Sequence, residues 1–248
     1  EDVVSAVAAL PYDVYNRAEA CEVVKKEPLS FLRVDRAETS CPPDVDICDP
    51  CVYDKARTLL DEMIDDGIYL TEDKEVYYIY ELIMDGRSQS GIVACASIDD
   101  YMNNVIMKHE NTREDKEIDR INHVDICNAQ TGPIFLAYRS RQEINQVVQK
   151  VKLNDAIYSF VSNDGITHNV WVVDSLEDIQ TIREGFAQTE HIYIADGHHR
   201  AASAVKVGLK RRADNPEHTG EEEYNYFLSV LFPHEELMIM PYNRVVKD

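Results

Sequence analysis

The stretch HIYIADGHHRAASAVKVGLK, residues 191–210, joins a strand-like segment to a helix-like segment. Residues 192–196 are short and mostly apolar, as in a buried strand, whereas small and apolar residues recur at helical spacing after them. Gly197 lies between the two segments and permits a tight turn that a larger side chain would hinder. We therefore predict an interior strand at residues 192–196 and a helix that begins within two residues of His199.

The start of this predicted helix collects groups that favour an anion. The first amide groups of a helix have no partner within the helix, and the helix dipole favours negative charge there. Arg200 offers the planar, two-point contact that phosphate oxygens accept, and His198 and His199 add donors. In two alternative interpretations the histidines satisfy buried polar groups or bind a metal ion. We favour an anion-binding turn that comprises Asp196, Gly197 and the three residues after them.

The rest of the chain mixes helical periodicity with hairpins. Hairpins are predicted around Asp85–Gly86 and around Asn163–Gly165, where turn residues separate strand-like segments. Further strands are predicted at residues 29–34, 224–232 and 237–240, the last two as a possible hairpin. Together with the helices, this pattern predicts an α+β fold with a mixed sheet and flanking helices. We expect residues 1–248 to form a single domain, the N-terminal part of a longer protein.

Capping residues locate the predicted helices. Asn16 and Glu19 have the spacing of a capping box, and so do Ser97 with Asp100 and Ser175 with Asp178. The predicted helices are residues 17–27, residues 50–66 ended by Gly67, residues 97–110, a helix from Arg113 capped by Thr112, and residues 175–186.

The charge balance excludes some functions. The formal net charge is −21, from 46 acidic and 25 basic residues. Such a surface repels phosphate backbones, so we expect no nucleic-acid partner. The basic cluster at residues 206–212 is explained by the favourable position of cations near a helix C-terminus. No apolar stretch approaches the length of a membrane span, and the acidic N-terminus does not resemble a secretory signal. We expect a cytoplasmic protein with reduced thiols.

Three cysteines lie close together in CPPDVDICDPC, residues 41–51. The spacing of Cys48 and Cys51 is compatible with a metal or a redox site. A closed zinc site needs four ligands, however, and the chain has no second pair with this spacing. Asp49 followed by Pro50 is typical of a helix start. We predict that this pair begins a helix and holds no structural metal.

A second polar cluster is KHENTREDKEIDR, residues 108–120. The charges after Arg113 are explained as i,i+4 pairs on a solvated helix. His109 and Glu110 lie at the predicted break between two helices, where a carboxylate beside a histidine could accept a proton. Arg113 at the new helix start is a candidate anion contact. We expect His109 and Arg200 to face one shared cleft.

Two further residues are candidates for the same site. Asp13, in LPYDVYN, is either a turn former or a base for a hydroxyl ligand. Arg33 lies in an apolar segment that we predict to be a strand. A charge in such a segment needs a partner, so we expect either a carboxylate or an anionic ligand beside it.

Several segments resemble a known family. IADGHHRAASA looks like the signature of the family known as domain of unknown function 1015. The resemblance extends to VAALPYDVYN, EPLSFLRVDRAE, MDGRSQSG, IMKHENTREDKEIDR, TGPIFLAY and LFPHEELMIMPYNRVV. The glycine–histidine–arginine turn also resembles the phosphate-binding turn of the ParB/sulfiredoxin-like superfamily. That group includes nucleotide-binding partition proteins, sulfiredoxins and nucleotide-dependent kinases of free serine. The resemblance implies a ParB/sulfiredoxin-like core.

Within that superfamily the sequence argues against two roles. Partition proteins carry DNA-binding segments, whereas this chain is acidic and lacks a helix-turn-helix. Sulfiredoxins need a cysteine beside the glycine turn, where this chain has histidine. The resemblance therefore favours a nucleotide- or phosphate-binding enzyme that transfers a phosphoryl group to a small hydroxyl compound, such as free serine.

The expected site follows from these observations. Residues 196–200 would bind ATP or ADP, with Mg²⁺ between the phosphate oxygens, and Arg33 and Arg113 would add positive charge. Asp13, Glu110 or His109 would handle the hydroxyl proton. A non-catalytic sensor of a phosphorylated ligand, and a hydrolase that uses His198 and His199, are the alternatives. No Walker loop or kinase glycine-rich loop is present, and the oligomeric state is left open.

Overall fold

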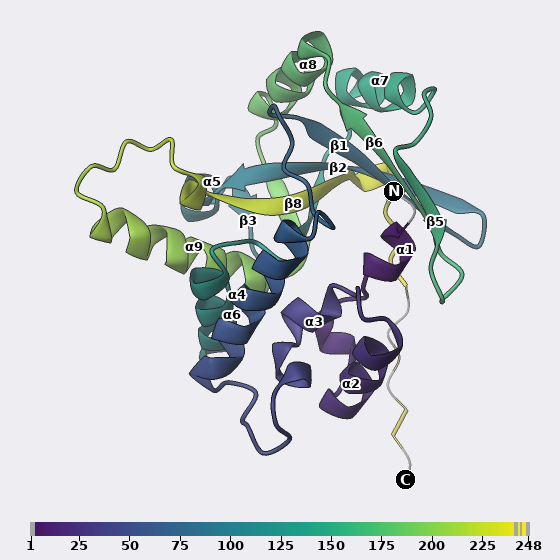
Figure 1. The fold of residues 1–248 in the computed structure, drawn as a ribbon. Helices are drawn as coiled ribbons and strands as arrows, with labels where there is room; N and C mark the ends of the chain where they lie inside the picture. The colour runs from purple at the N-terminus through teal and green to yellow at the C-terminus, as the bar shows by residue number, and fades with distance from the viewer. Residues whose placement is uncertain (1–2, 241–242, 244, 247–248) are drawn as a thin grey trace.

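The computed structural model describes residues 3–240, 243 and 245–246. Its centre is a sheet of eight strands in the order β3-β7-β4-β8-β2-β1-β6-β5 (Figure 1). The β3–β7 and β4–β8 neighbours are parallel, and the other neighbours are antiparallel. The predicted α+β class with a mixed sheet is confirmed. The strands are β1 Tyr77–Met84, β2 Arg87–Ser97, β3 Ile106–Met107, β4 Ile134–Tyr138, β5 Tyr158–Val161, β6 Thr167–Val173, β7 Ile192–Asp196 and β8 Tyr226–Pro233.

Helices surround this sheet and also form a separate N-terminal group. They are α1 Val4–Val7, α2 Arg17–Lys26, α3 Leu32–Asp35, α4 Pro50–Asp65, α5 Ile98–Met102, α6 Glu114–Cys127, α7 Gln142–Val151, α8 Leu176–Ala187 and α9 His198–Asp214. Short 3₁₀ turns are η1 Tyr12–Val14, η2 Ala37–Ser40, η3 Glu223–Asn225 and η4 His234–Glu236.

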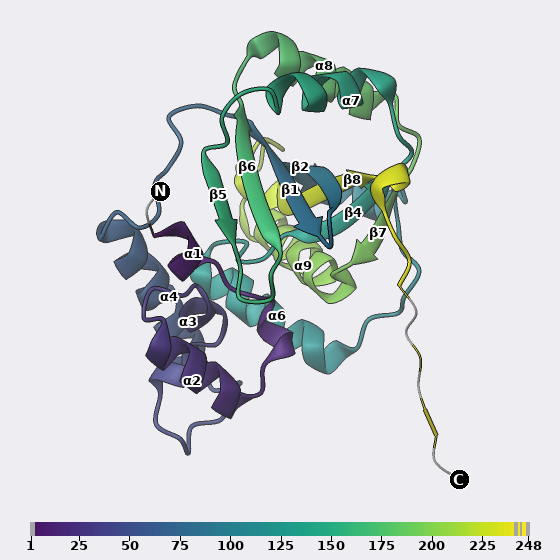
Figure 2. The same ribbon diagram turned by 90° about the vertical axis from the view of Figure 1, so that its right-hand side faces the viewer.

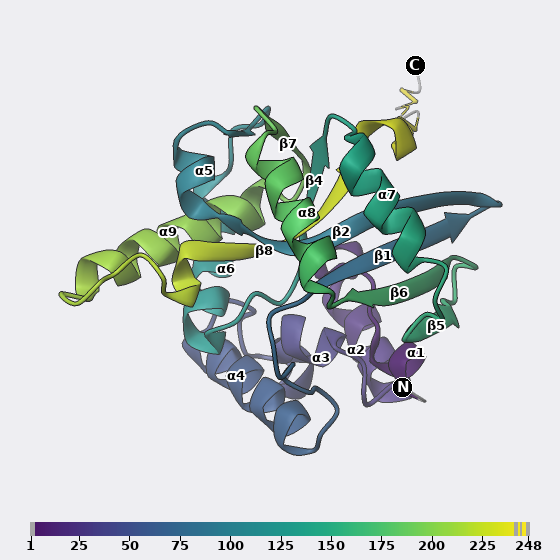
Figure 3. The same ribbon diagram turned by 90° about the horizontal axis from the view of Figure 1, so that it is seen from above.

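The sheet lies between two helical layers. Helices α7 and α8 cover one face, and α9 with α6 lies on the other, as the three views show (Figures 1, 2 and 3). Ile79 and Ile92 of the sheet are buried in one core with Ile144 of α7 and Ala201 of α9. Ala204 and Val205 of α9 are buried in the same core.

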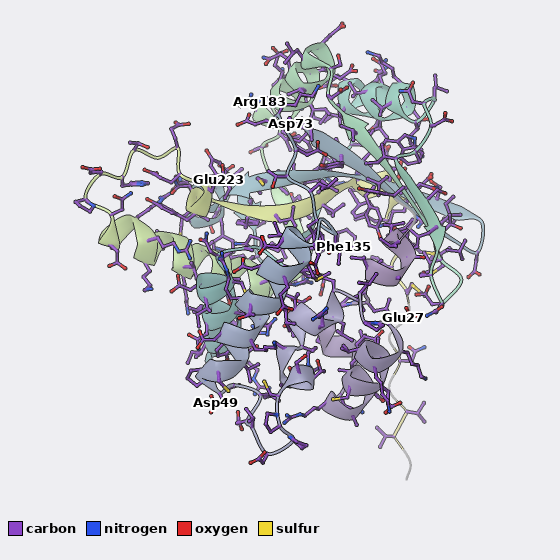
Figure 4. All side chains as sticks on the ribbon, in the orientation of Figure 1. Glu27, Asp49, Asp73, Phe135, Arg183 and Glu223 are labelled. Atoms are coloured by element: carbon purple, nitrogen blue, oxygen red, sulfur yellow. The ribbon has the colours of Figure 1, made fainter. Side chains whose placement is uncertain are left out.

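The N-terminal helices have a core of their own. Val34, Leu59 and Met63 are buried there with Cys127 from the end of α6, so this group packs against α6. Figure 4 shows Glu27, just after α2, on the side of this group, and Arg183 of α8 on the far side of the sheet. The residues that the structure describes therefore form two apolar cores, and α6 contributes to the N-terminal one.

Several helix starts and hairpin turns form where capping and turn residues in the sequence predict them. Asn16 and Glu19 form the predicted capping box at the start of α2. Asp49 accepts a hydrogen bond from the Cys51 amide, and Pro50 is the first residue of α4, as predicted. The β1–β2 hairpin turns at Asp85 and Gly86, whose φ angles are 51° and 77°. Positive φ at both residues suits the right-handed twist of a two-residue hairpin. The β5–β6 hairpin also forms.

Two strand predictions are wrong. Residues 29–34 do not form a strand, because the Arg33 amide bonds the Ser30 carbonyl and the chain turns into α3. Short apolar runs do not distinguish a buried strand from a buried helical turn. Leu32 and Val34 are both buried, and Val34 belongs to the core of the N-terminal helices. Residues 237–240 form no strand either. The chain turns through η4 after β8 and runs on without sheet pairing among the described residues.

Helix boundaries also differ from the prediction. The helix predicted at 97–110 ends at Met102, and Asn104 adopts a φ of 58° before the short strand β3. A left-handed residue breaks the helix, and pairing with β7 replaces it. Helix α6 has Arg113 rather than Thr112 at its N-cap. Ser175 is the N-cap of α8, but its side chain makes no capping hydrogen bond.

Candidate functional site

The strand–turn–helix unit forms as predicted. Strand β7 is interior because it pairs with β3 on one side and β4 on the other. Helix α9 begins at His198, and Gly197 is its N-cap with a φ of 93°. Other residues rarely adopt this left-handed conformation, so glycine is needed at this position. Since Gly197 has no side chain to cap the helix, the first amide groups of α9 stay available to another acceptor.

Arg200 connects this turn to the start of β4. Its guanidinium donates hydrogen bonds of 2.8 Å to the Pro133 carbonyl and of 2.8 Å to Asp196 Oδ2. The guanidinium lies against two glycines from distant segments. A Cβ atom on Gly132 or Gly197 would approach it to 3.3 or 3.2 Å. The two glycines therefore leave the space that Arg200 occupies.

His198 meets the predicted second cluster. Its ring packs edge-on against His109, with the ring centroids 4.4 Å apart. Nε2 of His198 accepts a hydrogen bond from the His109 amide at 3.4 Å, and Nδ1 lies 3.7 Å from Glu110 Oε2. Burial, then the nearby His109, lowers the pKa of His198, and Glu110 acts in the opposite direction. A neutral ring that accepts at Nε2 carries its proton on Nδ1, which faces Glu110.

His199 points to a different environment from His198. Its carbonyl accepts a hydrogen bond from Ser203 Oγ at 2.7 Å. Its Nδ1 atom is buried, and within the described part of the chain it has no hydrogen-bond partner. Burial acts to raise the pKa of the nearby Glu117, but Lys206, a hydrogen bond from Thr112 and, least of all, His199 lower it overall. The side chains of the two adjacent histidines thus lie in different surroundings, His198 beside His109 and Glu110 and His199 near Glu117.

Arg200 also lies in the wall of a cavity of about 550 Å³. Residues 7–11 and Phe31 make this wall apolar on the side of the N-terminal helices, whereas Arg120 and His123 of α6 make it polar on the other. A second cavity of about 220 Å³ adjoins it. Four side chains line both cavities: Tyr12, Asp35, Arg120 and His123.

Arg120 is a buried charge held in one position. Only 8 % of the residue is exposed. Its Nε atom donates to Asp119 Oδ2 at 2.8 Å, and its guanidinium lies 4.2 Å from the centre of the Tyr12 ring. Tyr53 in turn donates to Asp119 Oδ1 at 2.9 Å. Asp119 and the aromatic face offset the desolvation of the guanidinium, which leaves a fixed positive charge at the cavity.

Asp35 and His123 are the unusual pair of this site. Burial raises the pKa of the Asp35 carboxyl, and the charge of His123, a hydrogen bond from Thr131 and the charge of Arg120 only partly oppose it. Burial and then Arg120 lower the pKa of His123. Asp35 Oδ1 and His123 Nδ1 are both buried and lack a hydrogen-bond partner among the residues that the structure describes. An unpaired buried polar atom is costly, so such atoms in a cavity wall suggest a missing ligand.

The structure distributes the residues predicted from the sequence over several places. His109 and Glu110 lie in the loop between β3 and α6, not at a break between two helices, and both contact His198. Asp13, in η1, lines the smaller cavity. Arg113 is the N-cap of α6. His109 is not among the described residues that line the larger cavity, whereas Arg200 is.

Arg33 is not in a strand, which corrects its predicted setting. It lies in α3 and donates to the Pro28 carbonyl at 3.2 Å and to Glu62 Oε2 at 3.4 Å. The charge is thus accompanied by a partner carboxylate, one of the two outcomes expected for it. The pair is partly exposed, with a quarter of the Arg33 side chain and half of the Glu62 side chain accessible.

Asp35, Arg120 and His123 are functional candidates that the sequence does not predict. The charges after Arg113 are predicted to lie on a solvated helix, yet Arg120 is buried, and so is His123 one turn later. One signal could have found them: Glu117, Arg120 and His123 recur at intervals of three, which places them on one face of α6. Asp35 follows the segment that is predicted to be a strand, and no periodic pattern marks it.

The fold and the cavity define an α+β protein with a polar site between a strand–turn–helix unit and an N-terminal helical group. The family described as "Protein of unknown function (DUF1015)" matches residues 1–248, and the chain belongs to this family, as its motifs predict. No curated protein and no solved structure matches the chain. The ParB/sulfiredoxin-like core therefore stays a prediction.

Among the described residues, no group of three or more histidine, cysteine, aspartate or glutamate side chains could hold a metal ion. None of the helices in the described ranges is long and apolar enough to cross a membrane.

Proposed function

We propose that this protein binds a small molecule with a phosphate group, such as ATP or ADP, at the start of α9. We also propose that it transfers a phosphoryl group to a small hydroxyl compound, such as free serine. The observation that carries the proposal is the position of Arg200. It lies in the first turn of a 17-residue helix and in the wall of the 550 Å³ cavity that also contains Arg120. Sites for small ligands have volumes of about 300–1,000 Å³.

The phosphate part of the ligand has several donors at this position. The free amides at the start of α9 and the guanidinium of Arg200 favour an anion for independent reasons. Arg200 now contacts the carboxylate of Asp196, whose side chain is 73 % exposed. Because an exposed ion pair contributes little to stability, a phosphate group can replace this carboxylate at low cost.

A divalent ion is compatible with the groups near the turn. Mg²⁺ typically binds phosphate oxygens together with one or two carboxylates. Asp196 and Glu110 both lie close enough to His198 to influence its pKa, and their carboxylate oxygens are ligands of this type. A bound Mg²⁺ would offset negative charge on the phosphate oxygens.

The chain's own contribution to transfer is positioning and charge. Arg200 offsets the charge that develops on the transferred phosphoryl group, and the amides of the turn orient it. His198 is held by the His109 amide and faces Glu110, so this pair fixes the loop after β3 beside the turn. In this proposal the β7–Gly197–α9 unit is the centre of a ParB/sulfiredoxin-like core. The protein acts in the cytoplasm, consistent with its free cysteines.

Phosphorus NMR tests the proposal directly. The purified chain is incubated with MgATP or MgADP and a panel of hydroxyl amino acids, and a new phosphomonoester signal is the expected result. Binding is measured in parallel by calorimetry with ATP, ADP and inorganic phosphate. Nucleotide binding without any product would instead indicate a sensor of phosphorylated ligands. If no phosphate compound binds, the proposed function is refuted.

A further inference from the structure

One nitrogen atom in the cavity wall lacks the partner that its burial calls for. His123 is 3 % exposed, and its Nε2 atom lies 3.2 Å from the Val34 carbonyl oxygen. A carbonyl oxygen only accepts hydrogen bonds, so Nε2 carries a proton. In the neutral ring Nδ1 then carries no proton, and its lone pair can accept a hydrogen bond. This Nδ1 atom is buried and has no partner among the described residues. The hydrogen bond from Nε2 to the Val34 carbonyl therefore holds the ring in place, and Nδ1 is left as a hydrogen-bond acceptor.

The surroundings of this acceptor define what can bind it. Burial and then the neighbouring Arg120 lower the pKa of His123, so the resting ring is neutral, whereas the nearby Asp35 and Asp119 carboxylates favour the charged ring once it takes up a proton. Asp35 contributes a second buried oxygen without a partner in the described chain, and Arg120 contributes a fixed positive charge. A ligand that satisfies this wall donates a hydrogen bond at one end and carries an anionic group at the other. Small hydroxy acids and hydroxy amino acids have this chemistry.

The same cavity reaches the proposed phosphate site. Arg200 and His123 line one continuous cavity although they come from α9 and α6. A hydroxyl group near His123 and a phosphate group near Arg200 would therefore share one enclosed space. The apolar side of the wall, formed by residues 7–11 and Phe31, would limit the access of water.

We propose that the larger cavity binds the hydroxyl compound and that His123 Nδ1 accepts the hydrogen bond, and then the proton, of its hydroxyl group. This inference rests on the proposed function for its phosphoryl donor. In the step, the hydroxyl oxygen forms a bond to the terminal phosphorus while its proton moves to His123 Nδ1. The bond from that phosphorus to the nucleotide oxygen breaks, and the nucleotide leaves with the electron pair. His123 then releases the proton to water.

Matched ligands test whether the cavity detects a hydroxyl group. L-serine is compared with L-alanine, and L-lactate with propanoate, by calorimetry on the wild-type chain without nucleotide. A buried acceptor that loses its donor weakens binding by about tenfold to a hundredfold, so the hydroxyl-bearing member of at least one pair should bind that much more tightly. Equal affinity within both pairs, or no binding by any of the four compounds, refutes the site.

A variant isolates the nitrogen. His123→Gln keeps a donor for the Val34 carbonyl but removes the acceptor at the Nδ1 position. It should abolish the preference for the hydroxyl compound and lower turnover with MgATP by about a hundredfold or more. His191→Gln is the control, because His191 also has a buried, unpaired Nδ1 but is not among the described residues that line the cavity. Unchanged turnover in His123→Gln contradicts the assignment.

A measurement on the wild-type chain guards against misfolding of the variant. Nitrogen-15 NMR of the imidazole rings reports which nitrogen carries a proton. Addition of L-serine should move the Nδ1 signal of His123 and leave that of His191 in place. An unmoved Nδ1 signal at saturating ligand overturns the proposal. If the chain forms product while this signal and the His123→Gln turnover stay unchanged, the proposed function stands and only the role of His123 fails.

Discussion

Replacing Arg200 by alanine separates a binding role from a structural one. In the structure the side chain donates two hydrogen bonds, both of 2.8 Å, to the Pro133 carbonyl and to Asp196. The bond to the carbonyl contributes about 1 kcal/mol to folding, and the exposed ion pair contributes between about 0 and 1 kcal/mol. Arg200→Ala should therefore lower the free energy of unfolding by about 1–2 kcal/mol. For a chain of this length, that corresponds to a fall in Tm of about 2–8 °C.

The effect on ligand affinity should be larger. A charged hydrogen bond to phosphate contributes about 1.5–3 kcal/mol, so the Kd for ATP or ADP should rise by roughly tenfold to a hundredfold. Arg200→Lys should fall between the wild type and Arg200→Ala, because lysine keeps the charge but loses the planar pair of donors. Calorimetry gives the Kd and thermal denaturation gives the Tm of each variant.

Arg141→Ala is a matched control for this experiment. Its side chain is 25 % exposed, compared with 23 % for Arg200, and it also donates to one carboxylate and one backbone carbonyl, those of Glu143 and Gln188, with a third hydrogen bond to the side-chain oxygen of Gln188. It does not line either cavity among the described residues. A similar loss of Tm with unchanged Kd is expected. If Arg200→Ala gives that same result, Arg200 is structural and the proposed phosphate site is refuted.

Three further predictions concern stability. Gly208→Ala should destabilise the fold by about 1–3 kcal/mol in urea titrations, because a Cβ there would collide with the Tyr224 carbonyl oxygen; a stabilised variant would contradict this packing. Asn16→Ala removes the cap of α2 and should lower the free energy of unfolding by about 1 kcal/mol, whereas an unchanged midpoint would mean that the cap contributes nothing. Burial lowers the pKa of His123, so the unfolded chain binds more protons just below its ordinary pKa of 6.5, and stability should fall as the pH decreases through that value. Asp35 has the opposite sign, since its raised pKa favours the folded state in acid; His123→Gln should therefore lose less stability than wild type between about pH 7 and about pH 5.5, and an equal loss would exclude His123 as a cause.

Local signals in the sequence predicted much of this fold. The capping box at Asn16, the Asp49–Pro50 helix start and the Asp85–Gly86 hairpin each depend on residues close together in the chain, and all three form. The strand order could not be predicted in this way. It depends on pairings such as β4 with β8, whose residues lie far apart in sequence. The strand predicted at residues 29–34 is wrong for the same reason, because only tertiary packing decides between a short strand and a helical turn.

In the candidate site, too, the part formed by residues close together in sequence could be predicted, and the part formed by distant segments could not. The turn at Gly197 and the role of α9 as its continuation follow from a glycine and a change in periodicity at one place. The cavity behind Arg200 instead needs α3, α6 and the segment before η1 to meet. Arg120 is indistinguishable from a solvated charge when α6 is considered alone. Its burial results from packing against Tyr12, more than a hundred residues earlier in the chain.

The position of β8 has a consequence for the order in which the protein can assemble during synthesis. Among the described strands β8 emerges last from the ribosome, yet it lies inside the sheet, between β4 and β2 (Figure 2). Until β8 is synthesised, the strands β3, β7 and β4 have no hydrogen-bonded connection to the other half of the sheet, which consists of β2, β1, β6 and β5. Each partial sheet then presents an unpaired edge that invites intermolecular pairing. Nascent chains that stop before Tyr226 should therefore depend on chaperones. The cavity beside Arg200 should be complete only after β8, which contributes Leu228 to its wall, has joined the two halves of the sheet.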